Sequence, residues 1–190
     1  MPTITVQMLS GYSKSLKQRI KNTLTQTLSG ILDANPDGVT VWLNEAPSEN
    51  YQRGFSSPQP GAEPTESAED IVRNFLTAME NRELSRAKTY LSDDFDMVFP
   101  GNARFSELEQ LIDWAKQRYQ SVSKTIHTIT TSYGQDSITV TCFGELSFIF
   151  HEDQPLQNVR FCDVFELKNH KICHQEVWND LAEIQRLQSQ

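Results

Sequence analysis

The chain has 190 residues, of which 37% are hydrophobic and 22% are charged, a composition typical of a soluble globular protein. Its formal net charge of −8 argues against general binding to nucleic acid or to an anionic membrane. No segment is apolar and long enough for a membrane span, and none has the pattern of a signal peptide. The three cysteines are odd in number and lack CxxC spacing, so we expect neither a disulfide framework nor a zinc site. We therefore expect a reducing, cytoplasmic location. The cysteines are Cys142, Cys162 and Cys173.

A proline-rich stretch divides the sequence into two parts. Residues 56–66 contain three prolines and nothing to bury, so they are predicted to form a stiff linker. We therefore expect a small domain over residues 1–55 and a larger domain over residues 67–190. The larger part has 12 basic and 19 acidic side chains, and thus carries most of the negative charge.

The first part is predicted to be a β-α-β unit. Residues 3–9 alternate between polar and apolar side chains, as a strand does. Residues 14–33 place their apolar side chains on one helical stripe, and residues 39–45 form a second alternating segment. This order gives a right-handed crossover with two parallel strands. One helix and two strands cannot close a core alone, so we expect the chain to form a homo-oligomer.

Pro2 is a candidate general base. The small residue at position 2 favours removal of Met1, which leaves a secondary amine at the start of the first strand. A low-dielectric, cationic environment lowers the pKa of such an amine below the usual ~7.7–8.0. The free base can then remove a proton from a carbon next to a carbonyl and return it elsewhere. Many unrelated chains begin with Met-Pro, so this residue alone does not decide the function.

The first part resembles the 4-oxalocrotonate tautomerase family over residues 2–54. The matching features are the segment PTITVQMLSG from Pro2, the amphipathic helix, and the strand VTVWLNE of residues 39–45. The resemblance implies that Pro2 is the catalytic base in keto–enol tautomerisation of 2-oxo acids. It further implies that Tyr51 walls the pocket and that the units share sheets in an oligomer.

Two positions depart from the pattern of that family. The arginines that bind the substrate carboxylate in the family fall on Tyr12 and Thr40 here. Another cation would have to replace them, and Arg53 is our candidate for substrate binding. Lys14 and Arg19 are alternatives.

The second part is predicted to be α+β, with helices followed by an antiparallel sheet. Ser67 and Asp70 resemble a helix-capping box, and Ser106 and Glu109 resemble another. Helical stripes follow both, and a short strand over residues 95–99 lies between them. Four further strands are predicted over residues 124–133, 136–150, 159–167 and 171–178.

Strand parity predicts which side chains face the core. Simple hairpin registers place a largely apolar set on the core face of the sheet, and four ionisable residues interrupt this set. Its apolar members are Ile129, Ile138, Val140, Cys142, Leu146, Phe148, Phe150, Phe161, Phe165, Leu167, Ile172 and Trp178. In these registers Asp163 lies opposite Glu176, and His127 lies opposite Cys142. Buried charges must pair or line a cavity. The predicted cone-pocket residues are therefore His127, Asp163, His174, Glu176 and Trp178.

Two interpretations of this ionisable cluster remain open. Two adjacent carboxylates share a proton, which raises one pKa and suits general acid–base chemistry. Alternatively, the cluster is a satisfied structural network of histidines and carboxylates. The spacing is not typical of a metal site, so we expect no metal and no cofactor.

The second part resembles the SnoaL-like branch of the nuclear-transport-factor-2-like superfamily over residues 67–185. The matching segments are Phe99-Pro100-Gly101 and the strand RFCDVFEL of residues 160–167. The resemblance implies an α+β cone, with helices packed on a curved antiparallel sheet and a pocket inside. Members of this superfamily include isomerases, cyclases, dehydratases, epoxide hydrolases and non-enzymatic binders, so the fold alone does not choose a function.

Three hypotheses for function follow. In the first, the protein is a tautomerase-like isomerase that uses Pro2 as general base on a small 2-oxo acid or enol. In the second, the cone binds or transforms a small hydrophobic molecule, and the first domain is an oligomerisation module. In the third, both domains bind or scaffold without catalysis. The expected partners are a small molecule and further copies of the chain, and neither nucleic acid nor membrane is expected.

Overall fold

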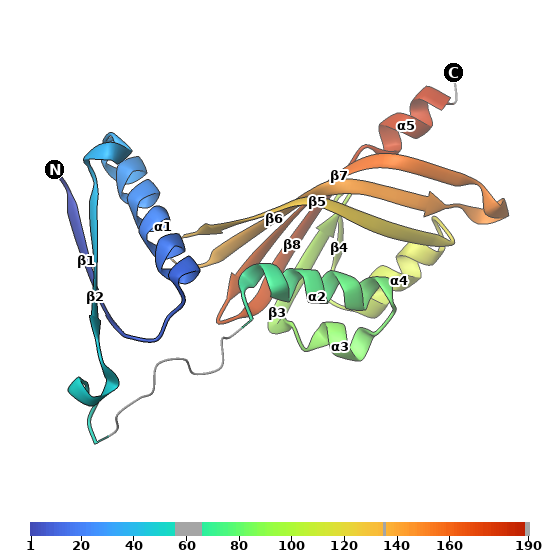
Figure 1. The fold of residues 1–190 in the computed structure, drawn as a ribbon. Coiled ribbons are helices and arrows are strands. Elements are labelled where there is room, and N and C mark those ends of the chain that lie inside the picture. Colours follow the sequence, from blue (N-terminus) through green and yellow to red (C-terminus); the bar gives the residue numbers. More distant parts are fainter. Residues whose placement is uncertain (56–65, 135, 189–190) are drawn as a thin grey trace. The chain divides into compact units, whose positions relative to one another are not determined.

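The computed structural model describes residues 1–55, 66–134 and 136–188 (Figure 1). The chain divides into two compact units, one up to Thr65 and one from Glu66 onward. The linker predicted over residues 56–66 lies, except for Glu66, outside the described residues. Within the described residues, no helix combines the length and the apolar character that crossing a bilayer would require.

The first unit is the predicted β-α-β arrangement. Strands β1 and β2 pair in parallel, from Thr3 opposite Thr40 to Leu9 opposite Ala46. The helix between them begins after Ser13, whose side chain accepts a hydrogen bond from the Leu16 N–H at 3.2 Å, as an N-cap residue does. The elements are β1 (Thr3–Leu9), α1 (Lys14–Leu32), the 3-10 turn η1 (Pro36–Gly38), β2 (Thr40–Ala46) and the 3-10 turn η2 (Ser48–Asn50).

This first unit has almost no closed core. The Lys17–Glu45 ion pair of 2.8 Å identifies the face of the sheet that α1 covers, because Glu45 shares its parity with Val41 and Leu43. On the opposite face the Trp42 side chain is 60% exposed. Of the described residues in this unit only Ser29 is buried. Such a two-stranded sheet is expected to need further protein on its open face or edges.

The second unit is a six-stranded sheet with the order β4-β3-β8-β7-β6-β5. The pair β3–β8 is parallel, and the other neighbours are antiparallel. Helices α2, α3 and α4 lie against one face of the curved sheet (Figure 1). The elements are α2 (Ala68–Glu80), α3 (Leu84–Lys88), β3 (Leu91–Phe99), β4 (Ala103–Phe105), α4 (Leu108–Lys116), β5 (Ser121–Tyr133), β6 (Ile138–Ile149), the 3-10 turn η3 (His151–Asp153), β7 (Pro155–Lys168), β8 (Lys171–Asn179) and α5 (Leu181–Gln188).

The helix signals of the second unit were partly correct. The Ser67 side chain accepts a hydrogen bond from the Asp70 N–H at 3.1 Å, so the first capping box is confirmed. The second box is wrong, because α4 begins after Glu107, which makes no side-chain cap. Helix α5 was not predicted, and its first residue, Leu181, is buried in the core.

The core lies between the helices and the inner face of the sheet, so the predicted α+β class is confirmed. Phe75 of α2 packs edge-to-face against Phe165 of β7, with ring centroids 6.1 Å apart. Most of the predicted inner-face residues are buried, and Val140, Cys142, Phe165 and Ile172 have no exposed surface. Amphipathic helices over one sheet face are a common two-layer solution for burying both apolar surfaces.

The register of β8 differs from the prediction because of a bulge. Leu167 pairs with Ile172 as expected, but Glu166 pairs with His174, so Cys173 is an extra residue in β8. A bulge shifts the inward–outward alternation of the strand by one residue. The Cys173 thiol donates a hydrogen bond to the Glu166 carbonyl at 3.3 Å across this bulge.

The bulge moves three predicted pocket residues to the outer face. His174 and Glu176 are partly exposed, and Trp178 is 50% exposed. Asp163 remains on the inner face, but it lies opposite Val177. The predicted pairing of Asp163 with Glu176 is therefore wrong.

A second bulge corrects the expectation for His127. Ile126 pairs with Gly144 and Thr128 pairs with Phe143, which leaves His127 as the extra, exposed residue of β5. Ile129 rather than His127 lies opposite Cys142. Preceding this bulge, the even-numbered residues of β5 point inward.

Candidate ligand-binding and active site

A cavity of about 160 Å³ lies inside the second unit, lined by residues of α2, α4 and α5 and of the sheet. Cavities of about 150 Å³ lined by apolar side chains accept a molecule such as benzene, so this one has room for a single ring-sized group. The exposed residues Glu80, Arg82 and Arg118 are part of its lining, so the cavity reaches solvent. Its wall is mainly apolar and includes Phe75, Leu76, Phe99, Trp114, Leu146 and Phe148.

Two polar side chains of this lining connect to a carboxylate behind the wall. Lys124 and Gln175 line the cavity, and both contact Asp163, which is fully buried. Lys124 Nζ forms an ion pair with Asp163 Oδ2, and Gln175 Nε2 donates a hydrogen bond to the same oxygen at 3.4 Å. Lys124 Nζ also lies 4.6 Å from the centroid of the Phe161 ring, a favourable cation–π position.

The Asp163 carboxyl group has an unusual environment. Burial raises its pKa, and the charge and hydrogen bonds of Lys124 and Gln175 only partly oppose this effect. Among the described residues, its Oδ1 atom has no hydrogen-bond partner. Burial and the neighbouring Asp163 raise the pKa of the Cys142 thiol to about 12. That thiol is therefore not a nucleophile near neutral pH.

The two bulges explain why these side chains meet. The extra residue His127 in β5 turns Lys124 inward, and the extra residue Cys173 in β8 turns Gln175 inward. Asp163 reaches the same region from β7, where regular alternation already predicted its inward position. Bulges are common next to functional sites, where they re-aim side chains.

Sequence reasoning missed Lys124 and Gln175. The residues Val122 and Ile126, two positions on either side of Lys124, would have indicated an inward-facing segment in β5. No comparable signal marks Gln175, because the apolar pattern of β8 does not reveal where the bulge lies.

The predicted site residues of the first unit lie at opposite ends of its sheet. Pro2 precedes β1, and its carbonyl accepts a hydrogen bond from the Thr40 N–H at 3.0 Å. Tyr51 and Arg53 line a depression of about 360 Å³ beside the other end of the strands, at Leu9. Seven strand residues span about 20 Å, so within one chain these residues do not form one site with Pro2.

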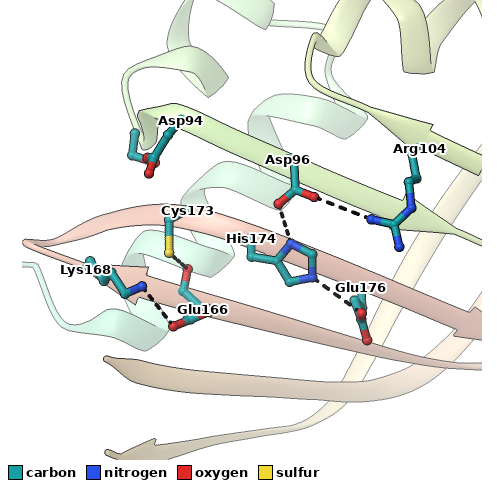
Figure 2. Close-up of polar contacts among 9 residues, drawn as sticks. Asp94, Asp96, Arg104, Glu166, Lys168, Cys173, His174 and Glu176 are labelled. Carbon is teal, nitrogen blue, oxygen red and sulfur yellow. Dashed lines mark hydrogen bonds and ion pairs between the residues drawn. The ribbon is translucent and has the colours of Figure 1, made fainter. Parts of the chain in front are cut away.

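His174 belongs to a separate polar cluster on the outer face (Figure 2). Its Nδ1 atom lies 2.5 Å from Asp96 Oδ1, and its Nε2 atom lies 3.5 Å from Glu176 Oε1. Arg104 Nη1 is 3.9 Å from the second oxygen of Asp96. Partial burial disfavours the charged imidazole, but the hydrogen bonds and charges of Asp96 and Glu176 outweigh this and raise the pKa of His174. These contacts satisfy the cluster locally and connect the parallel strands β3 and β8.

Comparison with known protein families identifies both units. A family model for the SnoaL-like domain matches residues 72–175, and a model for tautomerase enzymes matches residues 2–58. The predicted combination of two domains is thereby confirmed. No curated protein sequence matches the chain.

Solved structures share the fold at low sequence identity. An NTF2-like protein of unknown function from Burkholderia pseudomallei K96243 has 15% identity and a TM-score of 0.55, over 65% of this chain and 98% of its own. TerC, co-crystallised with polyporic acid, has 10% identity and a TM-score of 0.55 over the same shares. The hexachlorocyclohexane dehydrochlorinase LinA-type3 from Novosphingobium barchaimii LL02 has 12% identity and a TM-score of 0.51, over 59% and 83%.

Proposed function

Because the chain belongs to the SnoaL-like domain family and carries a tautomerase domain as well, we propose that it is an isomerase of small molecules whose reaction centre is the cavity of the second unit. Lys124 is the residue that contacts the bound molecule, and Asp163 is the buried group that exchanges a proton with Lys124. The two domain types support an isomerase-type or ligand-binding activity, and the assignment to this cavity is our own.

One observation carries this proposal: a fully buried carboxylate contacts a lysine that lines an apolar cavity. Burial raises the pKa of Asp163, and in the proposed step a proton passes from Lys124 Nζ to this contacting carboxylate, which leaves a neutral amine at the cavity wall. The neutral amine accepts a proton from a carbon next to a carbonyl and then returns a proton to another atom of the same molecule. The net reaction is an isomerisation and requires no co-reactant.

The test uses the full chain and the keto–enol conversion of phenylpyruvate. We expect Lys124→Met and Asp163→Asn each to lower kcat/KM by about 100-fold, the usual contribution of a positioned acid–base group. Arg104→Gln, which removes a cation outside the cavity, serves as control and is expected to be unchanged. Full activity of Lys124→Met would refute this proposal.

Pro2 supports a second candidate, a tautomerase site in the first unit. The residue is partly buried at the start of β1, and the tautomerase model begins with it. After removal of Met1, its secondary amine would act as the general base. In this case Pro2→Ala abolishes phenylpyruvate turnover while Lys124→Met does not, and an intact-mass measurement finds the chain without Met1.

The second candidate requires more than one copy of the chain. Tyr51 and Arg53 lie about 20 Å from Pro2 along the strands, and the positions of the family arginines hold Tyr12 and Thr40. If the β1 edges of two copies pair in antiparallel fashion, Pro2 of one copy lies beside the Leu9 end of the other. That end carries the depression lined by Tyr51 and Arg53, so the homo-oligomer would complete the site.

The surroundings in which this activity operates are also a proposal. The three cysteines are unpaired, and Cys142 and Cys173 are buried. Free thiols of this kind are usual in a reducing compartment, so we propose that the protein is cytoplasmic.

A further inference from the structure

Two arginines at the mouth of the cavity have no carboxylate partner in the part of the chain that the structure describes. The second unit has seven arginines, and four of them, Arg86, Arg104, Arg160 and Arg186, form ion pairs with acidic side chains. Among the described residues, neither Arg82 nor Arg118 has such a pair, although both line the cavity. Residues 67–190 contain 12 basic and 19 acidic side chains, so two cations without an acidic partner at one opening are unexpected.

Their present contacts leave most donors of both guanidinium groups available. Arg82 Nη1 donates one hydrogen bond to the Met79 carbonyl at 3.1 Å. Arg118 places its guanidinium carbon 4.5 Å from the centroid of the Trp114 ring. A guanidinium group has five N–H donors in a planar fork, a geometry that matches a carboxylate.

The other charged side chains of the lining do not cancel the positive charge of Arg82 and Arg118. Lys124 is already neutralised by Asp163, and Glu80 is the one further acidic side chain of the described lining. The mouth therefore keeps a net positive charge. Arg82 also has a left-handed backbone conformation, with φ of 61°. This conformation ends helix α2 in a Schellman-type cap, in which the Arg82 N–H donates to the Met79 carbonyl and the Glu83 N–H donates to the Ala78 carbonyl.

The inner wall of the cavity favours a flat, unsaturated group. Phe75, Phe99, Trp114, Tyr119 and Phe148 all contribute to the lining. Tyr119 and Phe148 meet edge-to-face, with ring centroids 5.1 Å apart. Aromatic side chains arranged in this way accept a further ring in stacked or edge-to-face contact.

We propose that the cavity selects small aromatic carboxylates, with the ring among the aromatic side chains and the carboxylate at Arg82 and Arg118. This inference rests on the proposed function, because it names the class of molecule that the same cavity takes. Arg82 and Arg118 are then residues that determine specificity through binding. The proton-transfer pair of Lys124 and Asp163 lies deeper in the second unit.

The test compares two probes of equal shape by isothermal titration calorimetry on the full chain. Phenylacetate carries the negative charge, and phenylacetamide is its neutral counterpart. We expect phenylacetate to bind at least about tenfold more tightly, which is the effect of a charge-assisted hydrogen bond. This preference should decrease as salt is added, because both arginines are exposed.

Variants decide whether the arginines cause the preference. Arg118→Gln and Arg82→Gln should each remove most of it, with phenylacetamide affinity unchanged within about twofold. Arg104→Gln removes the same charge outside the cavity and should keep the preference. Equal binding of both probes, or an equal loss in Arg104→Gln, would overturn this inference and leave the cavity as a binding site. If neither probe binds, the proposed function is overturned as well.

Discussion

Lys124 and Asp163 form an ion pair across the wall of the cavity, with the Asp163 side chain fully buried and the Lys124 side chain 23% exposed. One partner is therefore accessible to a bound molecule, and the other is sealed from solvent. A buried carboxylate of this kind is costly to ionise, and its cost should be measurable as a pH-dependent stability.

Asp163→Asn should change how stability depends on pH. Burial raises the pKa of Asp163 in the folded state above its unfolded value of about 3.9. The wild-type chain therefore loses stability as the pH rises from about 4 through the folded-state pKa. Relative to the wild type, Asp163→Asn should gain stability over this interval, as measured by urea unfolding between pH 4 and pH 8. Asp113→Asn changes an exposed position of α4 and is the control, whose unfolding free energy should vary with pH as that of the wild type does. The same pH dependence for Asp163→Asn would contradict the prediction.

His174→Gln should remove a pH-dependent stabilisation that the polar cluster on the outer face of the sheet provides. Asp96 and Glu176 raise the pKa of His174 above 6.5 in the folded state. This stabilisation is fully present below the unfolded pKa of about 6.5 and is lost as the pH rises through the folded-state pKa. The difference in unfolding free energy between wild type and variant should therefore be largest near pH 5 and shrink toward pH 9. The exposed His127, changed to Gln, is the matched control and should show no such trend.

Gly144→Ala should destabilise the second unit. A Cβ atom at Gly144 would lie 1.9 Å from the Thr125 carbonyl oxygen and 2.9 Å from a ring carbon of Phe161. Because the nearest atom is backbone, β5 would have to move, at a cost of about 1–3 kcal/mol or more. Thermal unfolding followed by circular dichroism measures this loss. Gly30→Ala in α1 meets no atom within 4 Å and should be neutral or stabilising by up to about 1 kcal/mol. Equal melting curves for Gly144→Ala and the wild type would count against the close approach.

Trp42→Lys should reduce the size of the homo-oligomer that we propose. Trp42 lies on the sheet face that α1 does not cover and is 60% exposed, so a second copy is expected to bury it. Size-exclusion chromatography with light scattering measures the mass of each species. Trp178→Lys makes the same change at a 50% exposed tryptophan of the second unit. If Trp178→Lys dissociates the oligomer and Trp42→Lys does not, the interface lies in the second unit and the prediction is wrong.

The sequence predicted the elements well because their patterns are local. The alternation of residues 3–9 and the Ser67 capping box needed no knowledge of distant contacts. The β7–β8 hairpin was correctly placed at Leu167 and Ile172. All of these follow from propensity and periodicity within a few residues.

The composition of the site could not be obtained in the same way. Asp163 was correctly placed on the inner face, but its partner is Lys124, a residue 39 positions earlier in the chain. That contact depends on a bulge at His127, and the position of Gln175 depends on the bulge at Cys173. The extra residue of a bulge leaves no periodic signal of its own, since it is defined by the pairing with the neighbouring strand.

The bulges at His127 and Cys173 each hold one residue outside the ladder of cross-strand pairs, so the inward positions of β5 and β8 do not depend on that residue being present. Deleting His127 would leave Ile126 opposite Gly144 and Thr128 opposite Phe143, so regular alternation would still point Lys124 inward. Deleting Cys173 would leave Leu167 opposite Ile172 and Glu166 opposite His174, so Gln175 would stay on the inner wall. A one-residue deletion at either point therefore removes the bulge and keeps the same side chains in the interior, a change of chain length that this domain can absorb.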